Sequence, residues 1–411
     1  MRWRGDNINI WIIDHYSVPV KYYPLARQTN FAKYLMKMGH NVQIIAASTV
    51  HNSDINLIAD NTLYKKINED GVNYILINSR NYTGNGISRI INMLDFAYKL
   101  PQVCRHFEKP DVIISTSMTM FACAEGIRIG RRWGVKTVAQ ITDLWPETLI
   151  AYGIVSKWNP IVLGLRYLEK WIYSRADRII FSMEGAYDYI IEQKWDRDIV
   201  FDKVFFINNG VELESFDKYK HEYKVHDIDL LDTRFKIVYT GSIRKVNNLG
   251  LLLDAAKYLS DDYLFLIWGD GDEREVLEQR VVDEHINNVV FKGRVDKKYI
   301  PYITSQADLN IAHNTPTELF RFGISFNKIF DYMAAGKPTL STFSCPYNPL
   351  VMYGAGKAVD VPNAHNIAKN IKYLAKMPND EYMQYCDNAR KAARIYSFEN
   401  LTKKLIKILM Y

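Results

Sequence analysis

The sequence lacks the features that mark membrane-spanning, metal-binding and nucleic-acid-binding proteins. No apolar run approaches the length of about 18 residues that a spanning helix needs, and the run before Asp14 is too short for the core of a signal peptide. The four cysteines (Cys104, Cys123, Cys345 and Cys386) are scattered without metal-site spacing. No dense Lys/Arg run carries a nucleic-acid-binding motif. We therefore expect a cytoplasmic protein with core-type cysteines and no nucleic-acid partner.

Length and composition indicate a folded protein with two domains. The 411 residues exceed one typical hydrophobic core. Hydrophobic residues make up 48% and charged residues 24%, which excludes a disordered chain. The net charge of +6 is small for this length, and the surplus of Lys and Arg lies in the first half.

Short apolar runs of the buried parallel-strand type alternate with helical patterns along the chain. A polar stretch with little periodicity, residues 212–234, interrupts this order, which restarts at Lys236. The alternation predicts an α/β protein with two Rossmann-like, doubly wound domains that face each other. Their expected bounds are residues 1–211 and 235–394, with 212–234 as the linker and a final helix, 395–411, packing back toward the first domain.

One helical pattern in the first half, residues 157–178, mixes Trp and Tyr with Lys and Arg. Such a helix can lie on an anionic membrane surface. Because Glu169 and Asp177 dilute the positive charge, we favour a helix that packs on its own sheet.

Acidic and aromatic residues follow the strand expected at residues 137–141. Asp143, Trp145 and Glu147 cluster there, and open α/β sheets bind ligands at the carboxyl ends of their strands. We interpret the cluster as part of a binding site, the alternative being an exposed turn built by Asp and Pro. The GxGxxG fingerprint is absent after the first strand. Lys21 and Arg27 near that strand are candidates for binding an anion, the equally favoured alternative being solvent-facing charges on a loop and a helix.

The most informative stretch is residues 322–340, FGISFNKIFDYMAAGKPTL. Ser325 is expected to cap the start of a helix, Gly336 to take the left-handed position at its end, and Pro338 to stop it. A helix start presents free N–H groups and partial positive charge, and Lys328 stands beside it. This pattern predicts an anion site, the alternative being an ordinary amphipathic helix with a solvated polar face.

Several second-half strands end in glycine-rich or polar turns, each of which alone could be simple turn chemistry. Their joint placement at one edge of a sheet predicts a pocket for a diphosphate, with Asp331 within reach of a ribose diol. The predicted donor-binding residues are Gly241, Ser242, Arg244, Lys245, Asn247, Gly269, Gly293, Arg294, Ser325, Asn327, Lys328 and Asp331.

These motifs resemble family 4 glycosyltransferases of the GT-B fold, particularly bacterial ones that build cell-surface polysaccharides. The second half carries the specific stretches YTGSIRKVNNLGLLLDAA, FLIWGDGDE, VVFKGRV and GISFNKIFDYMAAGKP. The resemblance of the first half is looser and is carried by the stretches RQTNFAKYLMKMGHNV, TDLWPE, RADRIIFS and NNGVELESF. The resemblance covers nearly the whole chain.

The resemblance implies metal-independent sugar transfer with retention of configuration, the donor on the second domain and the acceptor on the first. It makes Asp143, which falls where related enzymes carry a polar residue beside the donor sugar, the candidate proton acceptor, and it implies no metal or other cofactor. Charge and placement, not the resemblance, assign the neutralisation of the diphosphate to Arg244 and Lys328 as catalytic residues. The implied acceptor-binding residues are His15, Tyr16, Arg27, Arg89, Trp145 and Glu147.

The chain departs from the common family pattern at its paired glutamates, whose positions hold Gly323 and Asp331. Gly323 cannot supply the side-chain contact to the donor sugar. The arginine and lysine of the family's first turn are replaced by Ser242 and Asn247, and Arg244 with Lys245 lie between them.

The predicted reaction is transfer from a UDP-sugar, such as a UDP-N-acetylhexosamine, in capsule, O-antigen or exopolysaccharide synthesis. The expected acceptor is a glycan or a polyprenyl-diphosphate-linked glycan, reached by peripheral contact with the cytoplasmic face of the inner membrane. UDP over GDP follows from the resemblance alone. The alternatives are a nucleotide-sugar epimerase of the same fold and a non-catalytic GT-B subunit.

Overall fold

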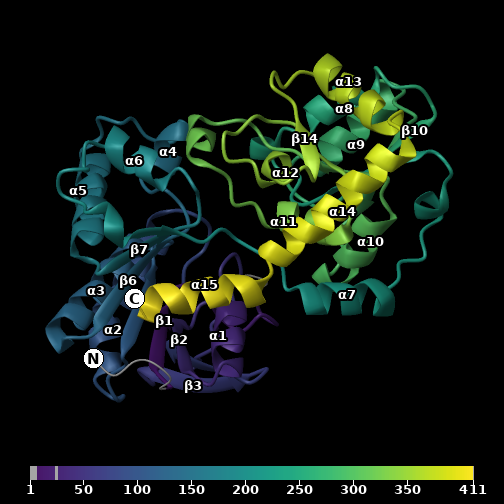
Figure 1. Ribbon diagram of the computed structural model, residues 1–411. Coiled ribbons are helices and arrows are strands. Elements are labelled where there is room, and N and C mark those ends of the chain that lie inside the picture. Colours follow the sequence, from purple (N-terminus) through teal and green to yellow (C-terminus); the bar gives the residue numbers. More distant parts are fainter. Residues whose placement is uncertain (1–6, 24–25, 411) are drawn as a thin grey trace. The chain divides into compact units, whose positions relative to one another are not determined.

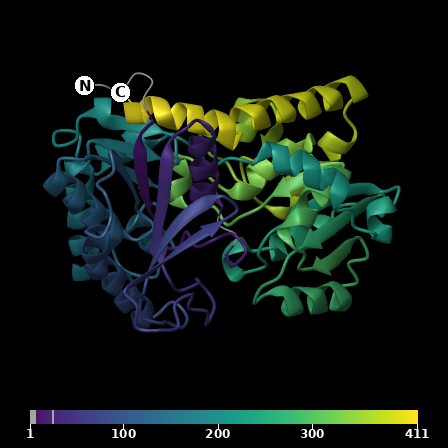
Figure 2. The same cartoon turned by 90° about the horizontal axis from the view of Figure 1, so that it is seen from below.

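A mostly parallel sheet organises each of the two units in this computed structural model, which describes residues 7–23 and 26–410 (Figures 1 and 2). The first unit comprises Met1–Asn208 and Leu401–Tyr411, and the second comprises Asn209–Asn400. Each unit has its own hydrophobic core.

The first sheet has the strand order β3-β4-β2-β1-β5-β6-β7-β8, in which the edge strand β3 pairs antiparallel with β4 and the other pairs are parallel. Central strands are buried on both faces, which explains why they read as continuous apolar runs. The strands are β1 (Asn9–Ile13), β2 (Asn41–Ala47), β3 (Tyr64–Glu69), β4 (Val72–Ile77), β5 (Val112–Thr116), β6 (Lys136–Ile141), β7 (Arg178–Phe181) and β8 (Val204–Phe206).

Helices cover both faces of this sheet. The connections through α2, α3 and α5 each lead to a strand nearer β8, whereas the connection through α1 leads from β1 to β2, toward β3. Because such connections are right-handed, α1 lies on the opposite face of the sheet from α2, α3 and α5. Figure 1 shows α2, α3 and α5 on the side away from α1. The helices are α1 (Arg27–Lys37), α2 (Ile87–Cys104), α3 (Met120–Trp133), α4 (Glu147–Ala151), α5 (Pro160–Arg175), α6 (Ala186–Glu192), the 3-10 turn η1 (Phe201–Lys203) and α15 (Phe398–Met410).

The second sheet is parallel throughout, in the order β11-β10-β9-β12-β13-β14. Its strands are β9 (Phe235–Thr240), β10 (Tyr263–Trp268), β11 (Val289–Gly293), β12 (Leu309–Ala312), β13 (Thr339–Ser341) and β14 (Gly356–Ala358). Its helices are α7 (Leu213–Glu222), α8 (Gly250–Ala256), α9 (Arg274–Asp283), α10 (Ile300–Gln306), α11 (Asn327–Ala335), α12 (Pro349–Met352), α13 (Ala364–Ala375) and α14 (Asn379–Ile395). The 3-10 turns are η2 (Ile228–Leu231), η3 (Lys245–Asn247), η4 (Lys297–Tyr299) and η5 (Glu318–Phe322).

The stretch expected as an irregular linker, residues 212–234, contains the helix α7 and the turn η2. The Glu212 carboxylate accepts a hydrogen bond from the Ser215 N–H (2.6 Å) and caps α7, which packs against α10. Phe216 is the buried residue of this helix, so too few apolar positions repeat to give a periodic pattern. The final helix, α15, falls where the sequence predicted it. In the first unit, Lys136 Nζ donates to the Leu409 carbonyl (3.1 Å).

A buried carboxylate joins α5 to α6. Glu169, only 2% exposed, accepts hydrogen bonds from the Tyr173 hydroxyl (2.7 Å) and from the Tyr189 hydroxyl (2.8 Å). Burial raises the pKa of Glu169 to about 8, although the two hydroxyls act in the opposite direction. The Tyr173 ring also packs edge-on against Phe181 of β7 (5.4 Å between centroids), so α5 packs on its own sheet, as the sequence favoured.

We expect this carboxyl to weaken the fold as the pH rises. Between the ordinary pKa of 4.5 and about 8, folded Glu169 keeps a proton that the unfolded chain has lost, so the free energy of unfolding falls with pH. Glu169→Gln should flatten this slope by about 1.4 kcal/mol per pH unit, measured by urea unfolding from pH 5 to 8. An unchanged slope, equal to that of the exposed control Glu108→Gln, would contradict the assignment.

Candidate functional site

Three glycines lie side by side where β9, β10 and β11 end. The Gly241 N–H donates to the Trp268 carbonyl (3.0 Å), and the Gly269 N–H donates to the Gly293 carbonyl (2.9 Å). Gly269 has a φ of +153°, and a Cβ there would lie 1.8 Å from the Gly241 carbonyl oxygen. The backbone can pack this closely only without side chains. The result is a flat edge of peptide groups at Gly241, Gly269 and Gly293, called the glycine edge below.

The Lys328 ammonium reaches this glycine edge from α11. Its Nζ donates to the Tyr239 hydroxyl (3.0 Å) and lies 4.3 Å from the centre of the Tyr239 ring. A Cβ built on Gly241 would lie 3.0 Å from Nζ. Lys328 is half-buried, and no carboxylate of the described residues forms an ion pair with it. Burial lowers its pKa from the usual value, because the charged form is deprived of water.

The start of α11 has no side-chain cap, which corrects the role predicted for Ser325. The residue preceding the helix is Phe326, in an extended conformation and without a capping hydrogen bond. The Ser325 hydroxyl instead accepts a hydrogen bond from the Asn209 N–H (3.1 Å), and the Asn209 side-chain amide donates to Asn327 Oδ1 (2.5 Å). The first-turn N–H groups therefore lack a side-chain cap. At the other end, Gly336 is left-handed (φ +68°), as predicted.

Aromatic packing fixes the backbone between Ser325 and α11. The sequence signal of a capping serine does not reveal this packing. The Phe326 ring packs edge-on against Phe320 (5.6 Å between centroids) and Phe343 (5.8 Å). This packing holds the Phe326 backbone extended, so the helix begins one residue later than a Ser325 cap requires.

The other predicted donor residues divide into free cations and structural groups. Arg244, Lys245 and Arg294 are exposed, and none forms an ion pair within the described part of the chain. The Ser242 hydroxyl donates to Asn247 Oδ1 (2.9 Å), so this pair shapes the turn after β9. Asp331 is half-buried, and burial raises its pKa against the opposing charge of Lys297.

Sequence reasoning missed three buried polar residues at the same edge. Besides Tyr239, these are Tyr332, whose hydroxyl accepts from the Thr240 N–H (2.9 Å), and His313. The His313 ring nitrogens lie 2.6 Å from Thr342 Oγ1 and 2.9 Å from the Asn248 carbonyl. Burial lowers the pKa of His313 to about 4, so the ring is neutral at pH 7. A histidine directly after the buried strand β12 was the signal available in the sequence.

In the first unit, the structure brings together His15, Tyr16 and Arg89 of the predicted acceptor residues. His15 is buried, with Nε2 2.7 Å from Asn92 Oδ1 on α2, and burial lowers its pKa to about 3. Arg89 Nε donates to the Tyr16 hydroxyl (2.8 Å). These contacts anchor the first turns of α2 at the carboxyl end of β1.

The remaining first-unit candidates are held by other groups. Asp143, half-buried after β6, accepts from the Thr148 hydroxyl (2.7 Å), and burial raises its pKa. Arg166 Nε donates to Glu147 (2.8 Å), so this carboxylate is already paired. Arg27 donates to the carbonyls of Ile207 (2.9 Å) and Asn208 (2.8 Å). Trp145, between Asp143 and Glu147, is half-buried.

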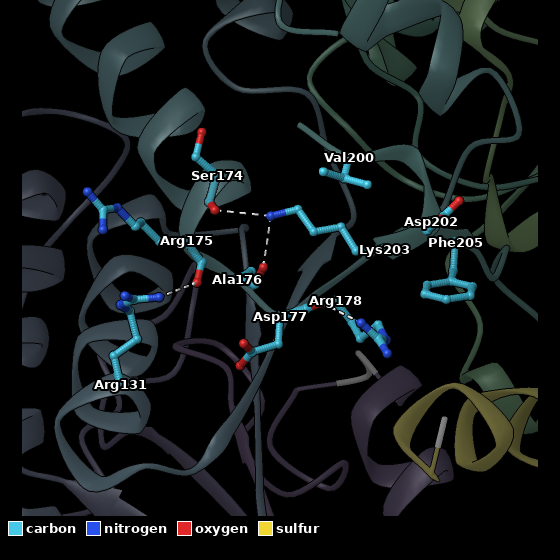
Figure 3. Close-up of a pocket in the computed structure, with 10 residues that line it drawn as sticks. All are labelled: Arg131, Ser174, Arg175, Ala176, Asp177, Arg178, Val200, Asp202, Lys203 and Phe205. Atoms are coloured by element: carbon cyan, nitrogen blue, oxygen red, sulfur yellow. Dashed lines mark hydrogen bonds between the residues drawn. The ribbon is translucent and has the colours of Figure 1, made fainter. Parts of the chain in front are cut away.

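A pocket of about 620 Å³ lies at the opposite, amino-terminal edge of β7 and β8 (Figure 3). Lys203, at its centre, donates to the carbonyls of Ser174 and Ala176 (3.0 Å each) at the end of α5. This lysine acts as a helix cap, and the predicted site residues do not line the pocket. Within residues 7–23 and 26–410, no cluster of three or more His, Cys, Asp or Glu side chains could hold a metal ion.

Two family models match successive parts of the chain. Residues 28–215 match the model described as "Glycosyltransferase Family 4", and residues 224–394 match "Glycosyl transferases group 1". The chain belongs to glycosyltransferase family 4. The family resemblance seen in the sequence is thereby confirmed.

The curated relatives are similar over part of their length. The putative colanic acid biosynthesis glycosyl transferase WcaI of Escherichia coli K12 is 23% identical over 234 residues, which is 55% of this chain and 56% of WcaI. The putative teichuronic acid biosynthesis glycosyltransferase TuaH of Bacillus subtilis is 26% identical over 214 residues, or 50% of each chain. The match thus spans about half the length of these two relatives.

Solved structures match almost the whole chain. HepE from Anabaena, in complex with UDP and glucose, aligns with a TM-score of 0.68 and 16% identity over 98% of this chain and 99% of that one. Sucrose-phosphate synthase from Thermosynechococcus elongatus aligns with a TM-score of 0.71 and 16% identity over 98% of both chains. The GT-B fold predicted from the sequence is confirmed.

The glycine edge should tolerate no side chain. Gly269→Ala adds a methyl group against the Gly241 carbonyl at a φ that L-residues rarely adopt, so we expect the second unit to lose about 2–4 kcal/mol of stability. The control is Gly250→Ala at the start of α8, where the added methyl group meets the end of the flexible Arg280 side chain at 3.1 Å and Leu277 Cδ2 at an ordinary contact distance of 3.8 Å. Equal stability of the two variants in guanidinium unfolding would contradict the tight packing.

Proposed function

We propose that this protein transfers a sugar from a nucleotide diphosphate donor to a glycan, and that the donor diphosphate binds at the start of α11. The half-buried Lys328, without a carboxylate partner, carries the proposal. It adjoins both an uncapped helix start and the glycine edge, and these supply N–H donors, partial positive charge and room for phosphate oxygens.

The chemical demand of this reaction is the negative charge that develops on the leaving diphosphate. Lys328 and the first-turn N–H groups of α11 would stabilise that charge, and exposed Arg244 would add a second cation. Asp331, on the same helix, would accept hydrogen bonds from the ribose hydroxyls. Gly323, at the end of η5, offers no side chain, so other groups must bind the donor sugar.

Proton transfer from the acceptor hydroxyl is assigned to Asp143. The raised pKa of this half-buried carboxyl makes it a stronger base than an exposed aspartate, while the Thr148 hydroxyl fixes its orientation. Retention of configuration and independence from metal are part of the proposal through the family resemblance.

We further propose a UDP-sugar as donor and a lipid-linked glycan of a bacterial cell-surface polysaccharide as acceptor. The complexes of HepE with UDP and glucose and with UDP-glucose support uracil as the nucleotide base of the donor. The names of WcaI and TuaH support a role in cell-surface polysaccharide synthesis. Helices long and apolar enough to cross a bilayer are absent from the described residues.

The donor class can be tested by a thermal-shift screen against UDP-, GDP- and dTDP-sugars. We expect UDP-sugars to raise the melting temperature most, because ligands that bind only the folded state stabilise it. Stabilisation by GDP- or dTDP-sugars alone would contradict the assignment of the base.

The phosphate contacts can be tested by substitution. Lys328→Ala and Arg244→Ala should each lower sugar transfer by about 10²–10³, because each removes a cation that acts on the leaving group. The measurement is UDP release from the donor, with circular dichroism to establish folding and exposed Lys369→Ala on α13 as the control. Full activity in either variant would overturn the phosphate assignment. An isomerised sugar released without acceptor would instead identify an epimerase.

A further inference from the structure

The buried side chain of His313 joins the segments that follow three neighbouring strands of the second sheet. The residue directly follows β12 and is 2% exposed. Its ring nitrogens lie 2.9 Å from the Asn248 carbonyl, in the turn after β9, and 2.6 Å from Thr342 Oγ1, directly after β13. Because β12 lies between β9 and β13, one imidazole connects both neighbours at the carboxyl edge of the sheet.

The two partners of the ring determine which nitrogen carries the hydrogen. Burial lowers the pKa of His313 to about 4, against the hydrogen bond to Asn248, so the ring is neutral at pH 7. A carbonyl oxygen only accepts, so Nε2 carries the hydrogen and donates to Asn248. Nδ1 then accepts from the Thr342 hydroxyl. The orientation of the ring is thereby fixed at both nitrogens.

The turn that receives this hydrogen bond carries two cations of the proposed phosphate site, Arg244 and Lys245, both exposed. Asn248 ends the turn in a left-handed conformation (φ +50°), which a non-glycine residue keeps only where its surroundings hold it. Its N–H donates to the Lys245 carbonyl (3.1 Å), and its carbonyl also accepts from the Leu251 N–H of α8 (3.1 Å). The bond from His313 therefore fixes the residue through which the turn passes into α8.

The start of the same turn is held by a second buried side chain. The Tyr239 hydroxyl donates to the Ser242 carbonyl (2.9 Å) and accepts from Lys328 (3.0 Å). The turn is thus fixed at one end by a contact of Lys328 and at the other by His313. Packing alone would be met by an apolar side chain, since burying an imidazole costs its hydration.

We propose that His313 is a positioning residue for the donor diphosphate, which holds the turn at residues 244–248 so that Arg244 is presented to the phosphate oxygens. The inference rests on the proposed function, in which Arg244 stabilises the leaving group. A guanidinium on a fixed backbone loses less conformational freedom on binding than one on a mobile loop. Both ring nitrogens of His313 are used within the protein, so its effect on the ligand passes through Arg244.

The test is a double-mutant cycle between His313 and Arg244, read as the affinity for UDP in titration calorimetry. His313→Leu removes both ring hydrogen bonds, and we expect UDP binding to weaken about tenfold. Arg244→Ala should then weaken binding by a much smaller factor in the His313→Leu background than in the unchanged protein, because the released turn no longer presents the guanidinium. His313→Gln should recover most of the affinity, since its amide can donate to the Asn248 carbonyl.

Hydrogen exchange of residues 241–252 without ligand reports on the turn itself. Exchange should be faster in His313→Leu and in Thr342→Val, a milder variant that frees Nδ1 and serves if the first does not fold. The control is Asn288→Leu, directly before β11, which removes a buried N–H donor to the Ala256 carbonyl (3.0 Å) at the opposite edge of the sheet. It should lower stability in urea unfolding and leave UDP affinity unchanged.

Equal factors for Arg244→Ala in both backgrounds, or unchanged exchange in the turn, would show that His313 supports only the fold and would overturn the proposal while leaving the proposed function intact. An equal loss of affinity in Asn288→Leu would attribute the effect to stability and overturn it as well. No UDP binding by the unchanged protein, or no loss in Arg244→Ala alone, would contradict the proposed donor site and the positioning role together.

Discussion

The second unit depends on the placement of one half-buried ammonium group. Lys328 contacts the Tyr239 hydroxyl and adjoins the Gly241 backbone, without a carboxylate to balance its charge. A protein usually pairs such a group, because removing a cation from water is costly. The proposed donor diphosphate would balance this charge. Binding of this ligand would also explain three other features. These are the uncapped start of α11, the absence of side chains along the glycine edge and the exposed, unpaired Arg244.

Close backbone packing makes that placement possible. Gly269 approaches the Gly241 carbonyl more closely than any side chain would allow, and the hydrogen bonds of Gly241 and Gly269 continue the sheet to its very edge. Neutral, buried His313 and Tyr332 fix the neighbouring strand ends without adding charge. The cations left for the proposed phosphate contacts are Lys328 and the exposed Arg244, Lys245 and Arg294.

The sequence predicted what local chemistry controls and missed what tertiary packing controls. Continuous apolar runs identified the central strands, and glycines at strand ends identified the edge at which they meet. The Ser325 cap was wrong because the packing of Phe326 against Phe320 and Phe343 sets where the helix begins. The helix α7 carries one buried residue and so left no periodic signal.

The central claim is that the donor diphosphate binds at the start of α11, and a crystal structure of the protein with UDP tests it most directly. The account predicts phosphate oxygens within hydrogen-bonding distance of Lys328 Nζ and of the N–H groups in the first turn of α11. A diphosphate bound elsewhere, with no phosphate oxygen near Lys328, would contradict it.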